Sequence, residues 1–76
     1  MKRKIYKVVY SNSKDFQDGI YHFSKPFESL KDAKAFESKI GKDKMNTRIE
    51  LHNEIYERNE WQPNFDMGKD WMEVIE

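Results

Sequence analysis

Hydrophobic residues recur at helical spacing between Ser29 and Gly41. They form one stripe, which consists of Leu30, Ala33 and Ile40 with either Phe36 or the polar Glu37 at the third position. The Ser29 hydroxyl is placed to accept a hydrogen bond from the backbone N–H of Asp32, which also puts negative charge at the start of the helix. Gly41 is a natural terminator. The pattern predicts a helix over residues 29–40 whose apolar stripe covers a sheet.

Two stretches before this helix have the pattern of strands. Lys4–Tyr10 is rich in β-branched and aromatic residues and contains no breaker. Its uncharged face consists of Tyr6, Val8 and Tyr10. After a turn-rich connection at residues 11–19, Ile20–Phe23 predicts a second strand that runs antiparallel to the first. Pro26 lacks a backbone N–H, and we expect Ser24–Phe27 to end that strand.

The stretch Thr47–Trp61 fits two patterns. As a strand, it has an apolar face that Asn53 interrupts. That face consists of Ile49, Leu51 and Ile55. As a helix, it begins with the capping-box pattern Thr47-x-x-Glu50. A two-stranded hairpin is marginal in water, whereas three strands backed by a helix are stable. We therefore favour a strand over residues 47–56, with a second helix over residues 47–60 as the alternative.

The remaining residues predict a loop and a closing strand. Gln62–Lys69 contains Pro63 and Gly68 and is typical of a loop. Asp70–Ile75 has the composition of a strand. The order β-β-α-β-β predicts an α+β fold, with a small antiparallel sheet and one helix packed on one face. We expect residues 1–76 to form a single small domain.

Composition limits how this domain is stabilised and where it resides. The chain has no cysteine, so it can form neither a disulfide nor a thiolate metal site. Five Phe, four Tyr and two Trp must supply much of the core. No run approaches the roughly 20 apolar residues that span a bilayer, and the basic start MKRK does not lead into a signal peptide. We expect a soluble protein of the cytoplasm that binds no membrane.

The net charge is zero, but the two halves of the chain carry opposite charge. Residues 1–49 hold twelve Lys and Arg against six Asp and Glu, whereas residues 50–76 hold two against eight. One interpretation is that the halves attract each other across the folded domain. The other is that a surface with both signs selects a partner by electrostatic complementarity.

No pattern in the chain indicates a catalytic, cofactor or metal site. His22 and His52 lie outside any ligand-spaced motif such as His-Glu-x-x-His. A second set alternates like a calcium loop: Asn64, Asp66, Gly68 and Asp70. However, the sixth and twelfth positions of an EF-hand loop would hold Lys69 and Ile75, which do not fit. We expect a protein that is not an enzyme and that binds no cofactor or metal.

The acidic and aromatic C-terminal third holds the strongest candidates for a contact surface. Trp and Met are enriched in the centres of protein interfaces, and Trp is a frequent hot spot. Trp61 lies beside Pro63 in a predicted loop, where burial is hard to arrange, whereas Trp71 fits the core better. We predict that Trp61 and Phe65 are partly exposed and contact a protein partner. The full set of candidate partner-binding residues is Trp61, Phe65, Met67, Glu57 and Glu60.

Three other functions stay open. The basic residues of the first strand, interleaved with tyrosines, favour contact with a nucleic acid, although the acidic C-terminal half opposes it. These basic residues are Lys2, Arg3, Lys4 and Lys7, and the tyrosines are Tyr6 and Tyr10. Conversely, the spaced carboxylates between Glu50 and Glu76 would let the protein act as a mimic of a nucleic acid toward a DNA-binding protein. Exposed edge strands offer a route to a homo-oligomer or a self-assembling structural protein.

In size, in the absence of cysteine and in its richness in Lys, Glu, Asn and Ile, the whole chain resembles small accessory proteins of bacteriophages and mobile elements. The resemblance implies a compact protein that binds and modulates a host protein, as inhibitors of defence or replication enzymes do. It assigns no functional residue, because no motif carries it. The first hypothesis is therefore a non-enzymatic protein-binding module.

Overall fold

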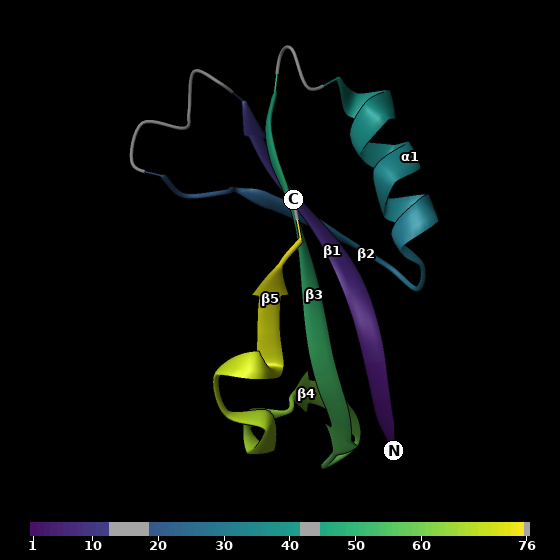
Figure 1. Cartoon of the computed structure of the whole chain (residues 1–76), viewed down its shortest axis with the longest axis vertical. Coiled ribbons are helices and arrows are strands. Elements are labelled where there is room, and N and C mark those ends of the chain that lie inside the picture. The colour runs from purple at the N-terminus through teal and green to yellow at the C-terminus, as the bar shows by residue number, and fades with distance from the viewer. Residues whose placement is uncertain (13–18, 42–44, 76) are drawn as a thin grey trace.

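The computed structural model describes residues 1–12, 19–41 and 45–75. They form an antiparallel sheet with an α-helix packed against it (Figure 1). The elements, in chain order, are β1 (Lys2–Asn12), β2 (Phe23–Phe27), α1 (Leu30–Ile40), β3 (Met45–Glu57), β4 (Glu60–Pro63), the 3-10 helix η1 (Phe65–Trp71) and β5 (Met72–Val74). The predicted α+β class is confirmed. The alternative of a second helix over residues 47–60 is wrong, because β3 occupies most of that stretch.

β3 is the centre of the sheet, whose strand order is β2-β1-β3-β4. β1 pairs with it antiparallel over the whole length of β1. The other edge of β3 carries two short strands in line, because β5 pairs with Glu50–His52 and β4 with Glu54–Glu57. With 13 residues, β3 is long enough to hold both. The strand predicted over residues 47–56 is therefore confirmed, and it organises the sheet.

The core lies between α1 and the sheet. Val8, Ala33 and Ile49 are fully buried (0% exposed), and Val8 lies directly opposite Ile49 in the ladder. Partly buried residues pack around these three: Tyr6, Tyr10, Phe27, Leu30, Phe36 and Ile75. This arrangement confirms both the predicted core face of the first strand and the role of the helix as a cover for the sheet.

Both ends of α1 follow local signals in the sequence. The Ser29 hydroxyl accepts a hydrogen bond from the backbone N–H of Asp32 at 3.2 Å. Gly41 ends the helix with a backbone φ of 86°, which residues that carry a Cβ rarely adopt. The apolar stripe has one buried polar member, Glu37, which accepts a hydrogen bond from Thr47 Oγ1 at 2.9 Å. Because a buried carboxylate needs such a partner, Glu37 ties α1 to β3.

The second strand lies later in the chain than predicted. β2 begins at Phe23 and runs through Pro26, so the expected strand at Ile20–Phe23 and the expected break at Ser24–Phe27 are both wrong. The predicted connection at residues 11–19 falls largely outside the described residues. In an antiparallel sheet, successive residues point their N–H and C=O groups alternately to the two sides of the strand. A proline is therefore tolerated wherever its nitrogen points outward.

Pro26 occupies such an outward position. The Tyr56 N–H donates to the Met1 carbonyl at 2.9 Å, so the odd-numbered residues of β1 point toward β3 and the even-numbered ones toward β2. Lys7 is odd-numbered, and its partner in β2 is Pro26. The nitrogen of Pro26 therefore points away from β1, and the ladder loses no hydrogen bond.

The C-terminal region also differs from its predicted form. The loop predicted over residues 62–69 is wrong, because β4 and η1 occupy most of it, whereas the closing strand predicted over residues 70–75 is present as the shorter β5. A two-residue turn joins β3 to β4 and needs positive φ at both positions, which Arg58 (53°) and Asn59 (65°) supply. The pair lacks the glycine that usually announces such a turn. Pro63 lies opposite Glu54 and, by the same alternation, turns its nitrogen away from β3.

Candidate functional site

The face of the sheet opposite α1 carries paired charges. Glu54 on β3 is 6% exposed and accepts a hydrogen bond from Arg3 Nε at 2.8 Å. Lys7 Nζ lies 3.6 Å from the other carboxylate oxygen of Glu54. A carboxylate removed from water requires partners of this kind. These contacts join the basic half of the chain to the acidic half, as the first interpretation of the charge pattern predicts.

Glu50 is a second buried carboxylate on the same face, and it is 7% exposed. Its Oε1 lies 2.9 Å from His52 Nε2, and its Oε2 accepts a hydrogen bond from the Arg48 guanidinium. Burial by itself raises the pKa of the Glu50 carboxyl, but the hydrogen bonds with His52 and Arg48 outweigh burial. The net effect places the pKa of Glu50 below its ordinary value of 4.5.

The lowered pKa of Glu50 makes the folded state sensitive to acid. A carboxyl whose pKa is lower in the folded chain stabilises the fold above the unfolded pKa, and this stabilisation is lost as the pH falls through the folded pKa. We expect the free energy of unfolding to decrease from about pH 5 downward, and the difference between wild type and Glu50→Gln to shrink over the same range. Urea unfolding at a series of pH values measures both. A difference that does not change with pH would assign the acid sensitivity to other carboxylates.

A cation–aromatic stack lies at the end of the sheet away from α1. Trp61 on β4 is the ladder partner of Tyr56 on β3, and their rings meet edge to face with centroids 5.2 Å apart. The Arg3 guanidinium lies 4.1 Å from the centroid of the Trp61 ring. Since the same guanidinium binds Glu54, Arg3 links a buried carboxylate to a half-buried indole. Trp61 is thus partly exposed, as predicted, and its ring is held in place.

A second aromatic pair belongs to η1. The rings of Phe65 and Trp71 meet edge to face at 5.4 Å, and Trp71 meets the His52 ring of β3 in the same way at 5.8 Å. Trp71 is half-buried against the sheet, whereas Phe65 is 67% exposed and Met67 is 43% exposed. The predicted exposure of Phe65 is therefore confirmed. Trp71 supports its ring from one side, which limits the orientations that Phe65 adopts.

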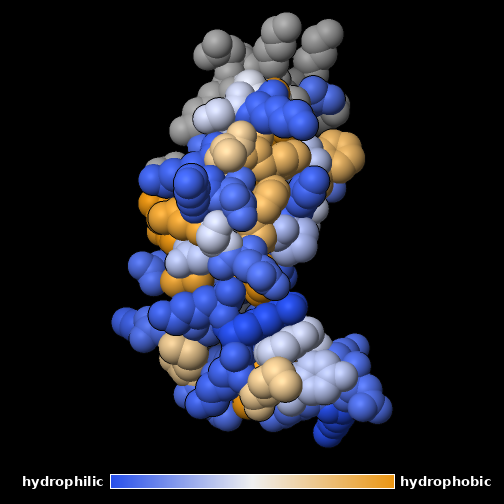
Figure 2. Space-filling model, turned by 90° about the vertical axis from the view of Figure 1, so that its right-hand side faces the viewer, coloured by the Kyte–Doolittle hydropathy of each residue, from blue (hydrophilic) through white to orange (hydrophobic). Residues whose placement is uncertain are grey.

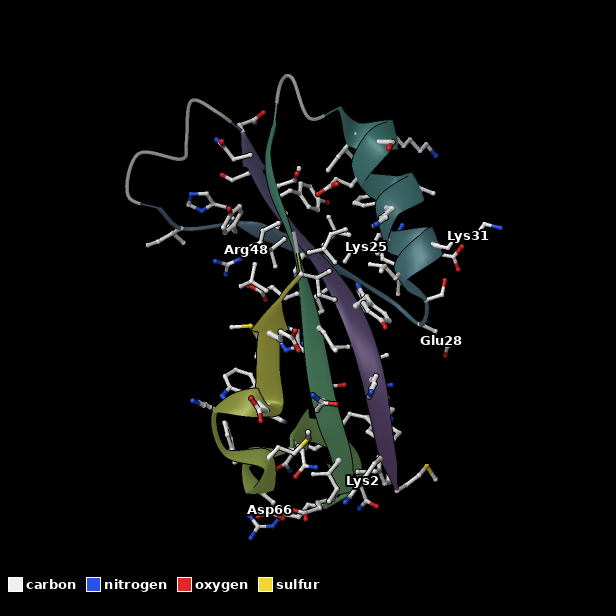
Figure 3. The ribbon with its side chains drawn as sticks, in the orientation of Figure 1. Lys2, Lys25, Glu28, Lys31, Arg48 and Asp66 are labelled. Carbon is white, nitrogen blue, oxygen red and sulfur yellow. The ribbon has the colours of Figure 1, made fainter. Side chains whose placement is uncertain are left out.

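The five predicted partner-binding residues all lie at one end of the sheet, which we call the hairpin end. It consists of residues 1–4, residues 54–63 and η1 (Figure 1). Glu57 and Glu60 face each other across the two-residue turn, and both are exposed. Figure 3 shows Lys2 and Asp66 at the same end, so the hairpin end carries charges of both signs.

These residues surround the hairpin end and do not form one flat patch. The Trp61 ring lies on the face of the sheet opposite α1, together with Arg3. Met67 borders a hollow that Lys2, Lys4 and Asn53 line from the α1 face and that also reaches Arg3 and Glu54 of the opposite face. The side of the molecule drawn in Figure 2 is a mosaic in which hydrophilic residues separate smaller hydrophobic patches. Contact with a partner would therefore combine apolar anchors with charged surroundings.

The hollow at the hairpin end has a volume of about 550 Å³, and sequence reasoning missed it. Its lining includes Lys2, Lys4, Asn53, Asn64 and Met67. The side-chain amide of Asn53 donates to the Asp70 carbonyl at 2.9 Å, and the Asn53 carbonyl accepts from the Asn64 N–H at 2.9 Å. Asn53 thereby holds η1 against β3. In the sequence, Asn53 is the polar residue that interrupts the apolar face of the strand. That interruption is the one sequence feature from which this hollow could have been anticipated.

The residues predicted to contact a nucleic acid have divided roles. Tyr6 and Tyr10 pack around the core, so their rings do not form the exposed platform on which bases stack. Arg3 and Lys7 pair with Glu54. Lys2 and Lys4 are exposed and border the hollow.

Comparison of the chain with protein-family models, with curated proteins and with solved structures finds no match. In the part of the chain that the structure describes, no helix is long and apolar enough to cross a membrane. Within those same ranges, no three side chains of His, Cys, Asp or Glu gather closely enough to hold a metal ion. A function for this chain therefore has to be argued from its surface.

Proposed function

We propose that this protein is a non-enzymatic protein-binding module whose contact surface is the hairpin end. The observation that carries the proposal is that four of the seven large hydrophobic side chains exposed in the described residues lie at this end, namely Met1, Tyr56, Phe65 and Met67. Large apolar side chains exposed among charged residues are typical of protein interaction sites, and here they surround one end of the sheet. Scattered single residues would need no such explanation.

The aromatic anchors of this surface are held in position before a partner arrives. Trp71 supports the ring of Phe65, and Arg3 and Tyr56 hold the ring of Trp61. An anchor that is already ordered loses less conformational entropy on binding, so more of its contact energy appears as affinity. This arrangement favours specific contact with one partner over non-specific hydrophobic association.

The resemblance to accessory proteins of bacteriophages and mobile elements extends the proposal to the kind of partner. On that basis the partner is a host protein that the module inhibits or modulates in the cytoplasm. The absence of cysteine is compatible with a reducing compartment. A nucleic acid has less support as a partner, because Arg3 and Lys7 are engaged by Glu54 and the tyrosines pack inward.

Phe65→Ala tests the proposed surface. We expect it to reduce capture of the partner from a lysate of the native host by at least about tenfold, because the variant removes an exposed anchor. The free energy of unfolding should change little, since the Phe65 side chain is mostly exposed. Trp61→Ala should weaken capture too, but with a loss of stability because Arg3 and Tyr56 contact its ring.

Phe23→Ala is the matched control, because Phe23 is an exposed phenylalanine on β2 outside the hairpin end. It should capture the partner as wild type does. Quantitative mass spectrometry of the captured proteins compares the variants, and urea unfolding verifies their stability. Normal capture by both Phe65→Ala and Trp61→Ala would show that the hairpin end is not the contact surface.

A further inference from the structure

The outer edge of β1 is only half occupied. β2 pairs with β1 at Tyr6–Tyr10, whereas β3 pairs with it from Lys2 onward. Within the described ranges, no strand pairs with the outer edge of Lys2–Ile5, and this part of β1 is the outermost strand in Figure 1. The corresponding edge of β3 is filled by two short strands in line, β5 and β4. The sheet therefore has room for one more short strand beside the start of β1.

The backbone at this edge is ordered and available for pairing. The Met1 carbonyl accepts a hydrogen bond from Tyr56, which anchors the start of β1. That bond also sets the alternation, so the N–H and C=O groups of Lys2 and Lys4 point outward, while those of Arg3 point to β3. Both lysines are exposed. An added strand would thus find two donors and two acceptors in a fixed geometry.

The outer edges of β2 and β4 are each protected from strand addition by a proline. Pro26 on β2 and Pro63 on β4 both turn their nitrogen outward, by the register with Lys7 and Glu54. Each removes a donor from its edge, which is a common means of preventing strand addition. The edge at Lys2–Ile5 contains no proline. It is marked instead by positive charge and by the hollow that Lys2 and Lys4 border.

We infer that this edge binds an extended acidic segment of a protein partner by strand addition. The inference rests on the proposed function and specifies the partner. In an added antiparallel strand, the residues opposite Lys2 and Lys4 lie two apart and point to the same face, beside the hollow. Acidic side chains at these alternate positions pair with the lysines across the strands. The segment therefore has the form acid-x-acid within an extended stretch.

A second copy of this chain fits the edge poorly. Two-fold antiparallel pairing of Lys2–Ile5 with itself would bring lysines and arginines of one copy against those of the other. Like charges directly opposite each other destabilise strand pairing. Glu54 does not reduce this repulsion between the lysines, because its carboxylate is already shared by Arg3 and Lys7. Charge complementarity thus selects an acidic strand.

The test uses the full chain and a fluorescein-labelled peptide, Glu-Val-Glu-Val-Glu-Val, with fluorescence anisotropy as the readout. We expect saturable binding that the double variant Lys2→Glu/Lys4→Glu weakens by at least about tenfold. Lys31→Glu/Lys39→Glu is the charge-matched control, since both lysines are exposed on α1 away from this edge (Figure 3 labels Lys31), and it should bind as wild type does. A Lys-Val peptide of the same length should not bind.

Hydrogen exchange separates strand addition from simple charge attraction. On peptide binding, the amide protons of Lys2 and Lys4 should become protected, whereas that of Arg3, which already points to β3, should change little. A peptide N-methylated at its glutamates, whose N–H groups face Lys2 and Lys4, keeps its charge but cannot complete the ladder, and it should bind at least about tenfold more weakly. Equal binding of the methylated peptide, or no protection at Lys2 and Lys4, would overturn the inference.

Failure of this inference is distinguishable from failure of the proposed function. If no acidic peptide binds while Phe65→Ala still abolishes capture of the host partner, the lysines act only to repel other strands, and the hairpin end stands without the added strand. If the peptide binds but Phe65→Ala captures normally, the edge is a binding site and the aromatic surface is not. A stable dimer that Lys2→Glu/Lys4→Glu disrupts, measured by light scattering, would also overturn the inference.

Discussion

Replacing Ile49 by alanine is expected to lower the free energy of unfolding by about 3 kcal/mol. Ile49 is fully buried at the middle of the central strand and packs with Val8 and Ala33. The substitution removes three heavy atoms from a site enclosed by the sheet on one side and α1 on the other. The cost combines the lost burial of those atoms with the cavity that remains.

The effect of Ile49→Ala should be large relative to the total stability, because a domain this small has a limited core. Urea unfolding followed by tryptophan fluorescence measures the change. Ile20→Ala is the matched control, since Ile20 is 55% exposed and its truncation removes less buried surface. Equal losses for the two variants would mean that the core is not centred on Ile49.

The helix was predictable because its signals are local. Ser29, Asp32 and Gly41 determine where α1 begins and ends, and each acts within a few residues of its own position. The strand over residues 47–56 was also predictable, because a stable small sheet requires more than two strands. In both cases the information lay in a short stretch or in a general property of sheets.

The position of β2 was not predictable in the same way. Pro26 argues against a strand when only its own residue type is considered, and only the register with Lys7 shows that its nitrogen points outward. Likewise, the turn at Arg58 and Asn59 lacks glycine, although both residues adopt positive φ. The side of the strand to which a residue points its N–H group depends on the register with a distant segment, and local propensity does not encode that register.

The candidate surface shows the same division. Glu57, Glu60, Trp61, Phe65 and Met67 are near one another in sequence, so their gathering at one end could be anticipated. The stack of Arg3 on Trp61 and the hollow beside Lys2 could not, because they depend on β1 lying next to β3. Arg3 and Glu54, for example, are 51 residues apart in the chain. The unoccupied edge of β1 is likewise a property of the assembled sheet.

Glu54→Ala is expected to lower the free energy of unfolding by about 2 kcal/mol. The variant leaves the Arg3 guanidinium and the Lys7 ammonium close together without the carboxylate that both contact. Breaking a fully buried ion pair costs about 3–5 kcal/mol. The loss here is smaller because the side chains of Arg3 and Lys7 are 37% and 31% exposed, so water screens the cations that remain. Urea unfolding measures the change.

Glu57→Ala provides the comparison, because Glu57 is an exposed glutamate on the same strand, and its removal should change stability by no more than about 0.5 kcal/mol. A double-mutant cycle with Arg3→Ala then isolates the pair itself. Because Arg3 contacts Trp61 as well as Glu54, the two substitutions should be non-additive by about 1 kcal/mol. The tryptophan fluorescence of the folded protein should change in each variant that lacks Arg3 or Glu54. Strict additivity would mean that Glu54 stabilises the sheet through packing alone, and that the charges on this face are independent of the aromatic anchor they surround.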